Sequence, residues 1–208
     1  AFLSKLPSEL GLFETILVRQ GKSQHLQLHL GRLSDSALAL GIPHSMIDIS
    51  KAIESVCENV SKDIDYRLRL DLDCSGKPSC QISPINPLPE SVKIFWASDL
   101  LPEPSKAILY SGNILLGHKI NSRDVYDQAW KLAEEHGGFD ALFINEQGFV
   151  TEGGRSSIFI KSGDRWLTPP VKAGLLPGVM RSIILNDPKW NAREANLTIE
   201  DVRSAKEI

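Results

Sequence analysis

The stretch Val150-Thr151-Glu152-Gly153-Gly154-Arg155-Ser156-Ser157-Ile158-Phe159 sets one acidic side chain between two segments that are rich in β-forming residues. Glycine and serine residues follow Glu152 closely, a composition that is typical of a tight turn. Lys119 precedes this stretch, and residues 175–181, a turn that leads into a predicted helix, follow it. An acid, an amine and two turns of small residues together indicate a site for an anionic cofactor that reacts with amines.

The chain has 208 residues, which is enough for one large domain or two small ones. Hydrophobic residues make up 42% of it and charged residues 24%, as in ordinary globular proteins. The net charge of -3 and the scattered basic residues give no footprint for nucleic acid or for an anionic membrane. No apolar run reaches the length of about 18 residues that spans a bilayer. We therefore expect a small-molecule substrate as the partner, with no nucleic acid and no membrane.

Three cysteines, Cys57, Cys74 and Cys80, occur without a Cys-x-x-Cys pair. Their odd number argues against a disulfide framework. Cys74 and Cys80 flank a turn, where they either face each other across a hairpin or remain two packed free thiols, and free thiols are the simpler expectation. This cysteine usage favours a reducing, cytoplasmic compartment.

Hydrophobic periodicity predicts mixed helices and strands. A run of β-forming residues, a glycine turn and an alternating run predict a hairpin over residues 12–18 and 24–28. The next expected elements are helices at 28–40 and about 48–61 and strands at 66–74, 81–85 and 92–97. In residues 66–74 leucine alternates with charged residues, which predicts a half-buried strand with a charged face.

Residues 98–118 contain prolines and glycines with little periodicity, so we expect a domain junction there. A small N-terminal domain is expected over residues 1–113 and a cofactor-binding domain over residues 114–208. The second domain is predicted to contain helices at 121–135, 177–185 and 199–205 and strands at 141–145, 149–151, 157–161 and 165–168.

Four features of the sequence offer chemistry. The amine of Lys119 follows the predicted junction, and a lysine attacks carbonyl groups when its surroundings favour the neutral amine. A carboxylate such as Glu152 that faces a pyridine nitrogen keeps that nitrogen protonated. The helix start at Val179 and Met180 offers N–H groups to a phosphate, and Arg32, next to an apolar helical stripe, offers a guanidinium. Each feature alone is more common as a solvated or purely structural one, so their combination carries the argument.

Other chemistries find little support in the sequence. His25 and His29 are four residues apart, but they straddle a predicted change from strand to helix and have no third ligand nearby. No Gly-x-Ser-x-Gly, Walker-type or dinucleotide-binding pattern occurs. A metal site is therefore not expected.

Five segments, in this order, resemble the class IV aminotransferase family, the fold-type IV enzymes that use pyridoxal phosphate. They are residues 13–16, residues 29–33 with 39–41, residues 117–119, residues 140–159, and residues 168–170 with 175–181. Within the family the chain is most similar to aminodeoxychorismate lyases, including the lyase-like region of fused para-aminobenzoate synthases. The resemblance covers most of the chain between residues 12 and 185.

The resemblance implies an α/β (α+β) fold of two domains, in which mixed sheets are flanked by helices and pyridoxal 5'-phosphate lies between the domains of each subunit of a homodimer. Lys119 would hold the cofactor covalently and move protons, and Glu152 would pair with the pyridine nitrogen. The other implied contacts to the cofactor are Arg32, Ser156, Ser157, Val179 and Met180, of which Arg32, Val179 and Met180 would bind the phosphate. Candidates for contacts with substrate are Arg67, Arg69 and Arg155.

The reaction implied by the resemblance is the conversion of 4-amino-4-deoxychorismate to 4-aminobenzoate and pyruvate, a step of folate biosynthesis. Two alternatives stay open: a class IV aminotransferase for branched-chain or D-amino acids, and a degenerate, non-catalytic domain of a fusion protein. The sequence departs from the family pattern at Asn121, which lies one position early, at Arg155 and at Met180, where threonine is frequent. The family's last cofactor-contacting loop is expected beyond Ile208, so the cofactor domain is expected to be truncated at its C-terminal end.

Overall fold

The computed structural model describes residues 9–208, and its contacts divide them into two compact units. Unit 1 is the described part of Ala1–Leu88 together with Lys119–Ser122. Unit 2 consists of Pro89–His118 and Arg123–Ile208. The expected domain boundary near residue 113 lies inside the first segment of unit 2, and the boundary between independently folding domains stays a prediction.

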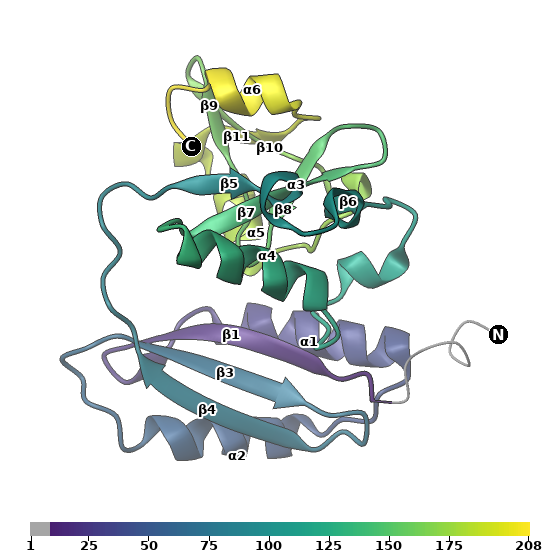
Figure 1. The fold of residues 1–208 in the computed structure, drawn as a ribbon. Helices are drawn as coiled ribbons and strands as arrows, with labels where there is room; N and C mark the ends of the chain where they lie inside the picture. The colour runs from purple at the N-terminus through teal and green to yellow at the C-terminus, as the bar shows by residue number, and fades with distance from the viewer. Residues whose placement is uncertain (1–8) are drawn as a thin grey trace. The chain divides into compact units, whose positions relative to one another are not determined.

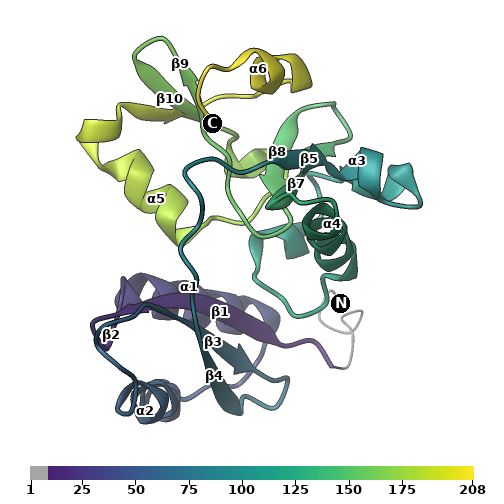
Figure 2. The same ribbon diagram turned by 60° about the vertical axis from the view of Figure 1, so that its left-hand side comes forward.

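Unit 1 is built on an antiparallel sheet with the strand order β2-β1-β3-β4 (Figures 1 and 2). Its strands are β1 (Leu12–Arg19), β2 (Lys22–Ser23), β3 (Tyr66–Leu72) and β4 (Pro78–Pro84). Leu68, Leu70 and Leu72 of β3 are buried, and the residues between them lie on the opposite face. The half-buried strand predicted for residues 66–74 is therefore confirmed.

Two helices complete unit 1: α1 (Leu26–Leu40) packs along β1, and α2 (Met46–Cys57) packs along β4 (Figure 1). Ser45 caps α2, because its hydroxyl accepts a hydrogen bond from the Asp48 N–H. The strand predicted for residues 24–28 is wrong. His25 adopts a left-handed conformation with a φ of 53°, and α1 begins immediately after it. Burial of the leucines of α1 outweighs the local alternation.

Gly76, in the turn between β3 and β4, has a φ of 84°, which L side chains rarely adopt. A Cβ at this position would also overlap with the backbone carbonyl of Pro43. We expect Gly76→Ala to lower the free energy of unfolding by about 2–3 kcal/mol. Urea titration followed by circular dichroism measures the change.

Gly21→Ala is the matched control, because Gly21 has a φ of 72° while only the Lys62 side chain lies nearby, at 3.7 Å. This variant carries the backbone strain without the overlap. An effect of Gly76→Ala no larger than that of Gly21→Ala would contradict the role assigned to the contact with Pro43.

Unit 2 contains two sheets. In the first, β7 lies between the parallel strands β5 and β6 and also pairs with the antiparallel strand β8. The elements around this sheet are β5 (Ile94–Trp96), α3 (Ala97–Leu100), η2 (Pro104–Ala107), β6 (Ile108–Leu109), η3 (Ile114–Gly117), α4 (Asp124–Glu135), β7 (Asp140–Asn145) and β8 (Val150–Gly153). Helix α4 packs against β7, and Phe143 of β7 is fully buried in this core.

The second sheet of unit 2 has the strand order β11-β10-β9. Its elements are β9 (Ile160–Ser162), β10 (Arg165–Thr168), η4 (Val171–Ala173), α5 (Val179–Asn186), η5 (Pro188–Trp190), β11 (Ala192–Glu194) and α6 (Ile199–Ser204). Figure 2 shows α6 beside the β9–β10 hairpin, where Val202 packs in one core with Ile160. Thr198 and Asp201 form a capping box at the start of α6.

Within residues 9–208, no helix has the length and apolar character that crossing a membrane requires. The same residues contain no group of three or more His, Cys, Asp or Glu side chains that is arranged to hold a metal ion. Cys57, Cys74 and Cys80 are free thiols.

Candidate functional site

Lys119 belongs to unit 1, where its segment extends the edge of the sheet. The Phe13 N–H donates to the Lys119 carbonyl at 2.9 Å, and Leu12 and Ile120 form an antiparallel bridge. Asn121 secures the same segment, since its Oδ1 accepts from the Gly11 N–H at 2.9 Å and its own N–H donates to the Gly11 carbonyl at 3.0 Å. The asparagine that lies one position early is thus part of the support for the Lys119 backbone.

The buried ring of Phe13 contacts two cations. The Lys119 Nζ lies 4.5 Å from the ring centroid, and the Arg69 guanidinium lies 4.1 Å from it. Aromatic rings attract cations at such distances. Phe13 therefore contacts both the lysine amine and an arginine on the charged face of β3.

This charged face carries both arginines that the sequence suggested as substrate contacts. Arg69 lies opposite Thr15 and is held by a two-pronged ion pair with Asp71, with nitrogen–oxygen distances of 2.8–3.0 Å. Arg67 lies opposite Leu17 and is exposed. Contact of either arginine with substrate stays a prediction.

Arg32, on α1, forms a buried cluster with two residues that sequence reasoning did not select. Its Nε and one terminal nitrogen donate to the two oxygens of Glu14, at 2.8 and 2.5 Å. The Nδ1 of His29 lies 2.7 Å from Glu14 Oε2. Burial raises the pKa of Glu14, but the hydrogen bonds and positive charges of His29 and Arg32 outweigh it, and the net pKa is lowered. The carboxylate is ionised in this cluster.

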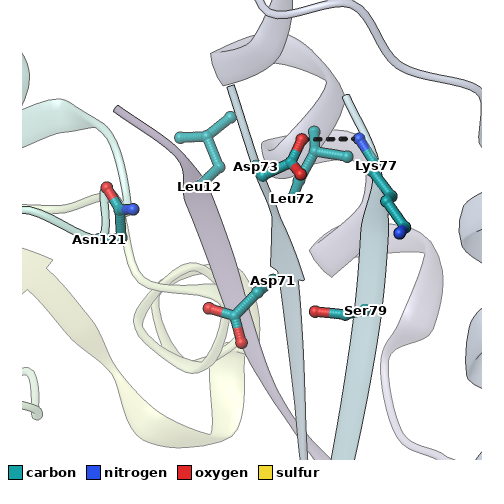
Figure 3. A pocket seen from close by; sticks show the side chains of 7 residues that line it. All are labelled: Leu12, Asp71, Leu72, Asp73, Lys77, Ser79 and Asn121. Carbon is teal, nitrogen blue, oxygen red and sulfur yellow. Dashed lines mark hydrogen bonds between the residues drawn. The ribbon is translucent and has the colours of Figure 1, made fainter. Parts of the chain in front are cut away.

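A surface hollow of about 290 Å³ opens at one end of the unit 1 sheet. The residues that line it, shown in Figure 3, are Leu12, Asp71, Leu72, Asp73, Lys77, Ser79 and Asn121. Asp73 accepts hydrogen bonds from the Ser75 hydroxyl and from the N–H groups of Lys77 and Ser75. These hydrogen bonds, the hydroxyl first among them, lower the pKa of Asp73. Two carboxylates and one ammonium group make this hollow unsuited to an anionic phosphate.

Glu152, at the end of β8 in unit 2, is 8% exposed and has two donors. The Tyr126 hydroxyl donates to Glu152 Oε1 at 2.9 Å, and the Leu176 N–H donates to Oε2 at 3.1 Å. Burial and the neighbouring Glu152 charge raise the pKa of Tyr126, so this phenol keeps its proton. Glu152 thereby joins helix α4 to the loop that precedes α5.

Asp140 explains the two glycines after Glu152. Its buried carboxylate accepts from the Arg155 N–H at 3.1 Å and from the Ser156 hydroxyl at 2.5 Å. A Cβ on Gly153 would overlap with Asp140 Oδ2, and a Cβ on Gly154 would lie 3.1 Å from Oδ1. The turn therefore needs glycine, and Ser156 fixes the turn through Asp140. A contact of Ser156 with cofactor stays a prediction.

Helix α5 begins at Val179, and its N-cap residue, Gly178, has no side chain that could cap the first N–H groups of the helix. The N–H groups of such a helix start can bind an anion. A Cβ on Gly178 would lie 2.9 Å from the Ser157 hydroxyl, so these two residues adjoin. Val179 is buried, whereas the Met180 side chain is 54% exposed. Met180 can thus contribute its backbone N–H, as the sequence suggested, while its side chain lies at the surface.

Arg181 follows in the first turn of α5 and is 5% exposed. It donates to the Pro169 carbonyl at 2.8 Å and to Glu194 at 2.5 Å. Its buried Nε has no hydrogen-bond partner among residues 9–208. The ion pair with Glu194 balances the charge of Arg181 and joins α5 to β11.

Arg155, by contrast, is engaged with the end of α4. Its guanidinium stacks on Trp130 and Phe139, donates to the Phe139 carbonyl and forms a 2.9 Å ion pair with Glu134. These contacts give the unusual arginine a structural role. Its suggested contact with substrate stays a prediction.

The predicted residues thus separate into two sets by unit. Unit 1 contains Lys119, Arg32, Arg67 and Arg69, and unit 2 contains Glu152, Ser156, Ser157, Val179 and Met180. Sequence reasoning missed the residues that hold the predicted ones in place, namely Phe13, Glu14, His29, Tyr126 and Asp140. A signal existed for Glu14, since the alternation of β1 places this carboxylate on the buried face of the strand.

A family model described as Amino-transferase class IV matches residues 11–208. A Schizosaccharomyces pombe protein, provisionally named an aminodeoxychorismate lyase, is 30% identical over an alignment of 197 residues that covers 93% of this chain and 80% of that protein. A Methanocaldococcus jannaschii protein, provisionally named a branched-chain-amino-acid aminotransferase, is 28% identical over 226 residues, covering 95% of this chain and 73% of that protein.

A crystal structure of a Mesorhizobium loti protein, provisionally named an amino-acid aminotransferase, superposes with a TM-score of 0.83 at 29% identity. The superposition covers 95% of this chain and 91% of that one. The mixed α/β fold expected from the sequence is therefore confirmed, while the position of a cofactor between two domains stays a prediction.

Proposed function

Because this chain belongs to the class IV aminotransferase family, we propose that it is a pyridoxal-phosphate-dependent lyase that converts 4-amino-4-deoxychorismate to 4-aminobenzoate and pyruvate. The similarity to the fission-yeast protein, which extends over 93% of this chain, carries the choice of reaction. Pyridoxal phosphate is the cofactor of this family of enzymes.

The donor set of the chain fits this cofactor. Pyridoxal phosphate presents an aldehyde, a pyridine nitrogen and a phosphate. Lys119 supplies an amine for the aldehyde, and the buried Glu152 supplies a carboxylate for the nitrogen. Helix α5 begins after a glycine N-cap and offers the N–H groups of its first turn, so it suits a phosphate. Arg32 adds a guanidinium to the set.

When bound, the cofactor supplies an electron sink for carbanion chemistry. Glu152 would hold a proton on the pyridine nitrogen, which keeps the ring electron-withdrawing. The Tyr126 hydroxyl and the Leu176 N–H fix both oxygens of Glu152, so the carboxylate needs little reorganisation to meet the nitrogen. The N–H groups of Val179 and Met180, with Arg32, would bind the phosphate.

Lys119 would first hold the cofactor and then act as the base that takes a proton from the substrate ring. Its backbone is fixed by the pairing with β1, and its amine lies over the Phe13 ring. Departure of pyruvate would then leave an aromatic ring as the product.

The lyase reaction needs no amino acceptor, and this separates it from transamination. Purified protein with pyridoxal phosphate and 4-amino-4-deoxychorismate is expected to release pyruvate in the absence of any 2-oxo acid. Coupling to lactate dehydrogenase measures the pyruvate continuously.

The second candidate is an aminotransferase for branched-chain amino acids, favoured by the 28% identity to the Methanocaldococcus jannaschii protein. A branched-chain amino acid with 2-oxoglutarate should then give glutamate. Glutamate formation without pyruvate release from aminodeoxychorismate would overturn the lyase in favour of this activity.

Tyr126→Phe removes the hydrogen bond from the Tyr126 hydroxyl to Glu152. A hydrogen bond to a charged group contributes about 1.5–3 kcal/mol, so we expect the affinity for pyridoxal phosphate to fall by about tenfold. Quenching of tryptophan fluorescence measures the dissociation constant. Tyr110→Phe is the control, because Tyr110 is 67% exposed and its variant should bind as the unmodified protein does. Equal affinity of both variants would show that Tyr126 does not position Glu152.

A further inference from the structure

Glu14 is an unusual residue for its place. It lies in the middle of β1 with only 1% of its surface exposed, on the face whose other members, such as Ile16 and Val18, are apolar. A buried carboxylate is unfavourable unless it is paired and hydrogen-bonded. Here it has three donors, all from α1. Helix α1 and strand β1 thus contact each other through charged side chains at a position where apolar side chains could also pack.

The geometry of this contact fixes the Arg32 guanidinium. Glu14 binds it through the edge formed by Nε and one terminal nitrogen, so two parallel hydrogen bonds set both the plane and the rotation of the group. This pair uses two of the five N–H groups of the guanidinium. The direction of the remaining N–H groups is therefore determined by Glu14.

His29 in turn holds Glu14. It lies one helical turn before Arg32 on α1, and its ring contacts the same carboxylate oxygen, Oε2, that Arg32 reaches with its terminal nitrogen. The His29 and Arg32 side chains are 11% and 12% exposed, so water competes little with these bonds. Two donors on adjacent turns prevent the carboxylate from rotating.

We propose that Glu14, held by His29, is a positioning residue that aims Arg32 at the phosphate of the cofactor. This inference rests on the proposed function, because it takes the phosphate contact of Arg32 from there. Glu14 itself contacts neither cofactor nor substrate in this account. Its effect on binding acts through Arg32 alone and concerns only the phosphate.

Pyridoxal phosphate and pyridoxal test the proposal, since the two differ only in the phosphate. Their dissociation constants are measured with purified apoprotein, for the unmodified chain and for Glu14→Gln and Arg32→Lys. Both variants are expected to bind pyridoxal phosphate about tenfold more weakly and to bind pyridoxal within about twofold of the unmodified chain. Asp65→Asn, which breaks the exposed pair with Arg19, is the matched control and should leave both constants unchanged.

The outcomes separate the two hypotheses. If the unmodified chain binds pyridoxal phosphate no more tightly than pyridoxal, the phosphate site of the proposed function fails. If Arg32→Lys loses the preference for pyridoxal phosphate over pyridoxal and Glu14→Gln keeps that preference, the phosphate contact of Arg32 stands and the positioning role of Glu14 is overturned. If Glu14→Gln weakens the binding of both ligands equally, Glu14 is a merely structural residue, and the positioning role is also overturned. Should Glu14→Gln not fold, His29→Asn replaces it, with a smaller loss of the same preference expected.

Discussion

Lys119→Ala is expected to abolish release of pyruvate from aminodeoxychorismate. The substitution removes the amine that would hold the cofactor and the base that would move the proton. Loss of a positioned acid–base group alone slows catalysis by about 10²–10⁴-fold, and loss of the covalent attachment adds to this. Steady-state assays of pyruvate release, at saturating pyridoxal phosphate, measure the effect.

Lys119→Arg distinguishes chemistry from charge at this position. The guanidinium keeps the positive charge over the Phe13 ring but stays protonated, so it serves neither as nucleophile nor as base. We expect this variant to fold like the unmodified protein and to be as inactive as Lys119→Ala. Turnover at the unmodified rate by either variant would contradict the catalytic role of Lys119.

Glu14→Ala is expected to destabilise the protein strongly. It leaves Arg32 and His29 buried without their carboxylate. Removing one partner of a buried ion pair costs about 3–5 kcal/mol, because the remaining charge stays desolvated. Urea unfolding monitored by circular dichroism gives the change in the free energy of unfolding. Asp65→Ala, at an exposed pair, is the control and should change it little.

The stabilisation from Glu14 should also depend on pH. The folded-state pKa of Glu14 is lowered from its ordinary value of 4.5. A lowered folded pKa means that the unfolded chain binds the proton more tightly, so this stabilisation is full above about pH 4.5 and disappears as the pH falls through the folded value. Glu14→Gln should remove that part of the acid dependence. An unchanged acid dependence in this variant would contradict the ionised pair.

Much of the fold was predictable because local patterns and burial agree. The strand at residues 66–74 alternates strictly, and the structure buries its leucines. The second helix and the last one begin after Ser45 and Thr198, whose hydroxyl groups satisfy first-turn N–H groups, as these residue types commonly do at helix starts. Near His25 the alternation typical of a strand competed with the helical spacing of the leucines, and there the predicted strand was wrong. The left-handed turn there depends on the packing of α1 against β1, which no local window contains.

The candidate site shows the same division. The sequence identified side chains that bear chemistry, Lys119, Glu152 and Arg32, because residue type and order identify a family. It did not identify Glu14, Tyr126 or Asp140, which hold those groups or their turns through contacts between residues 15 to 26 positions apart. Such partners emerge only when strands and helices are brought together.

The proposed function is tested most directly by locating the residue to which the cofactor attaches. The purified protein is incubated with pyridoxal phosphate, reduced with borohydride, digested and analysed by mass spectrometry. We expect one reduced phosphopyridoxyl group, attached to Lys119, and its loss when pyridoxal phosphate is omitted. A protein that carries no such group, or carries it mainly on an exposed lysine such as Lys189, would contradict the role proposed for Lys119.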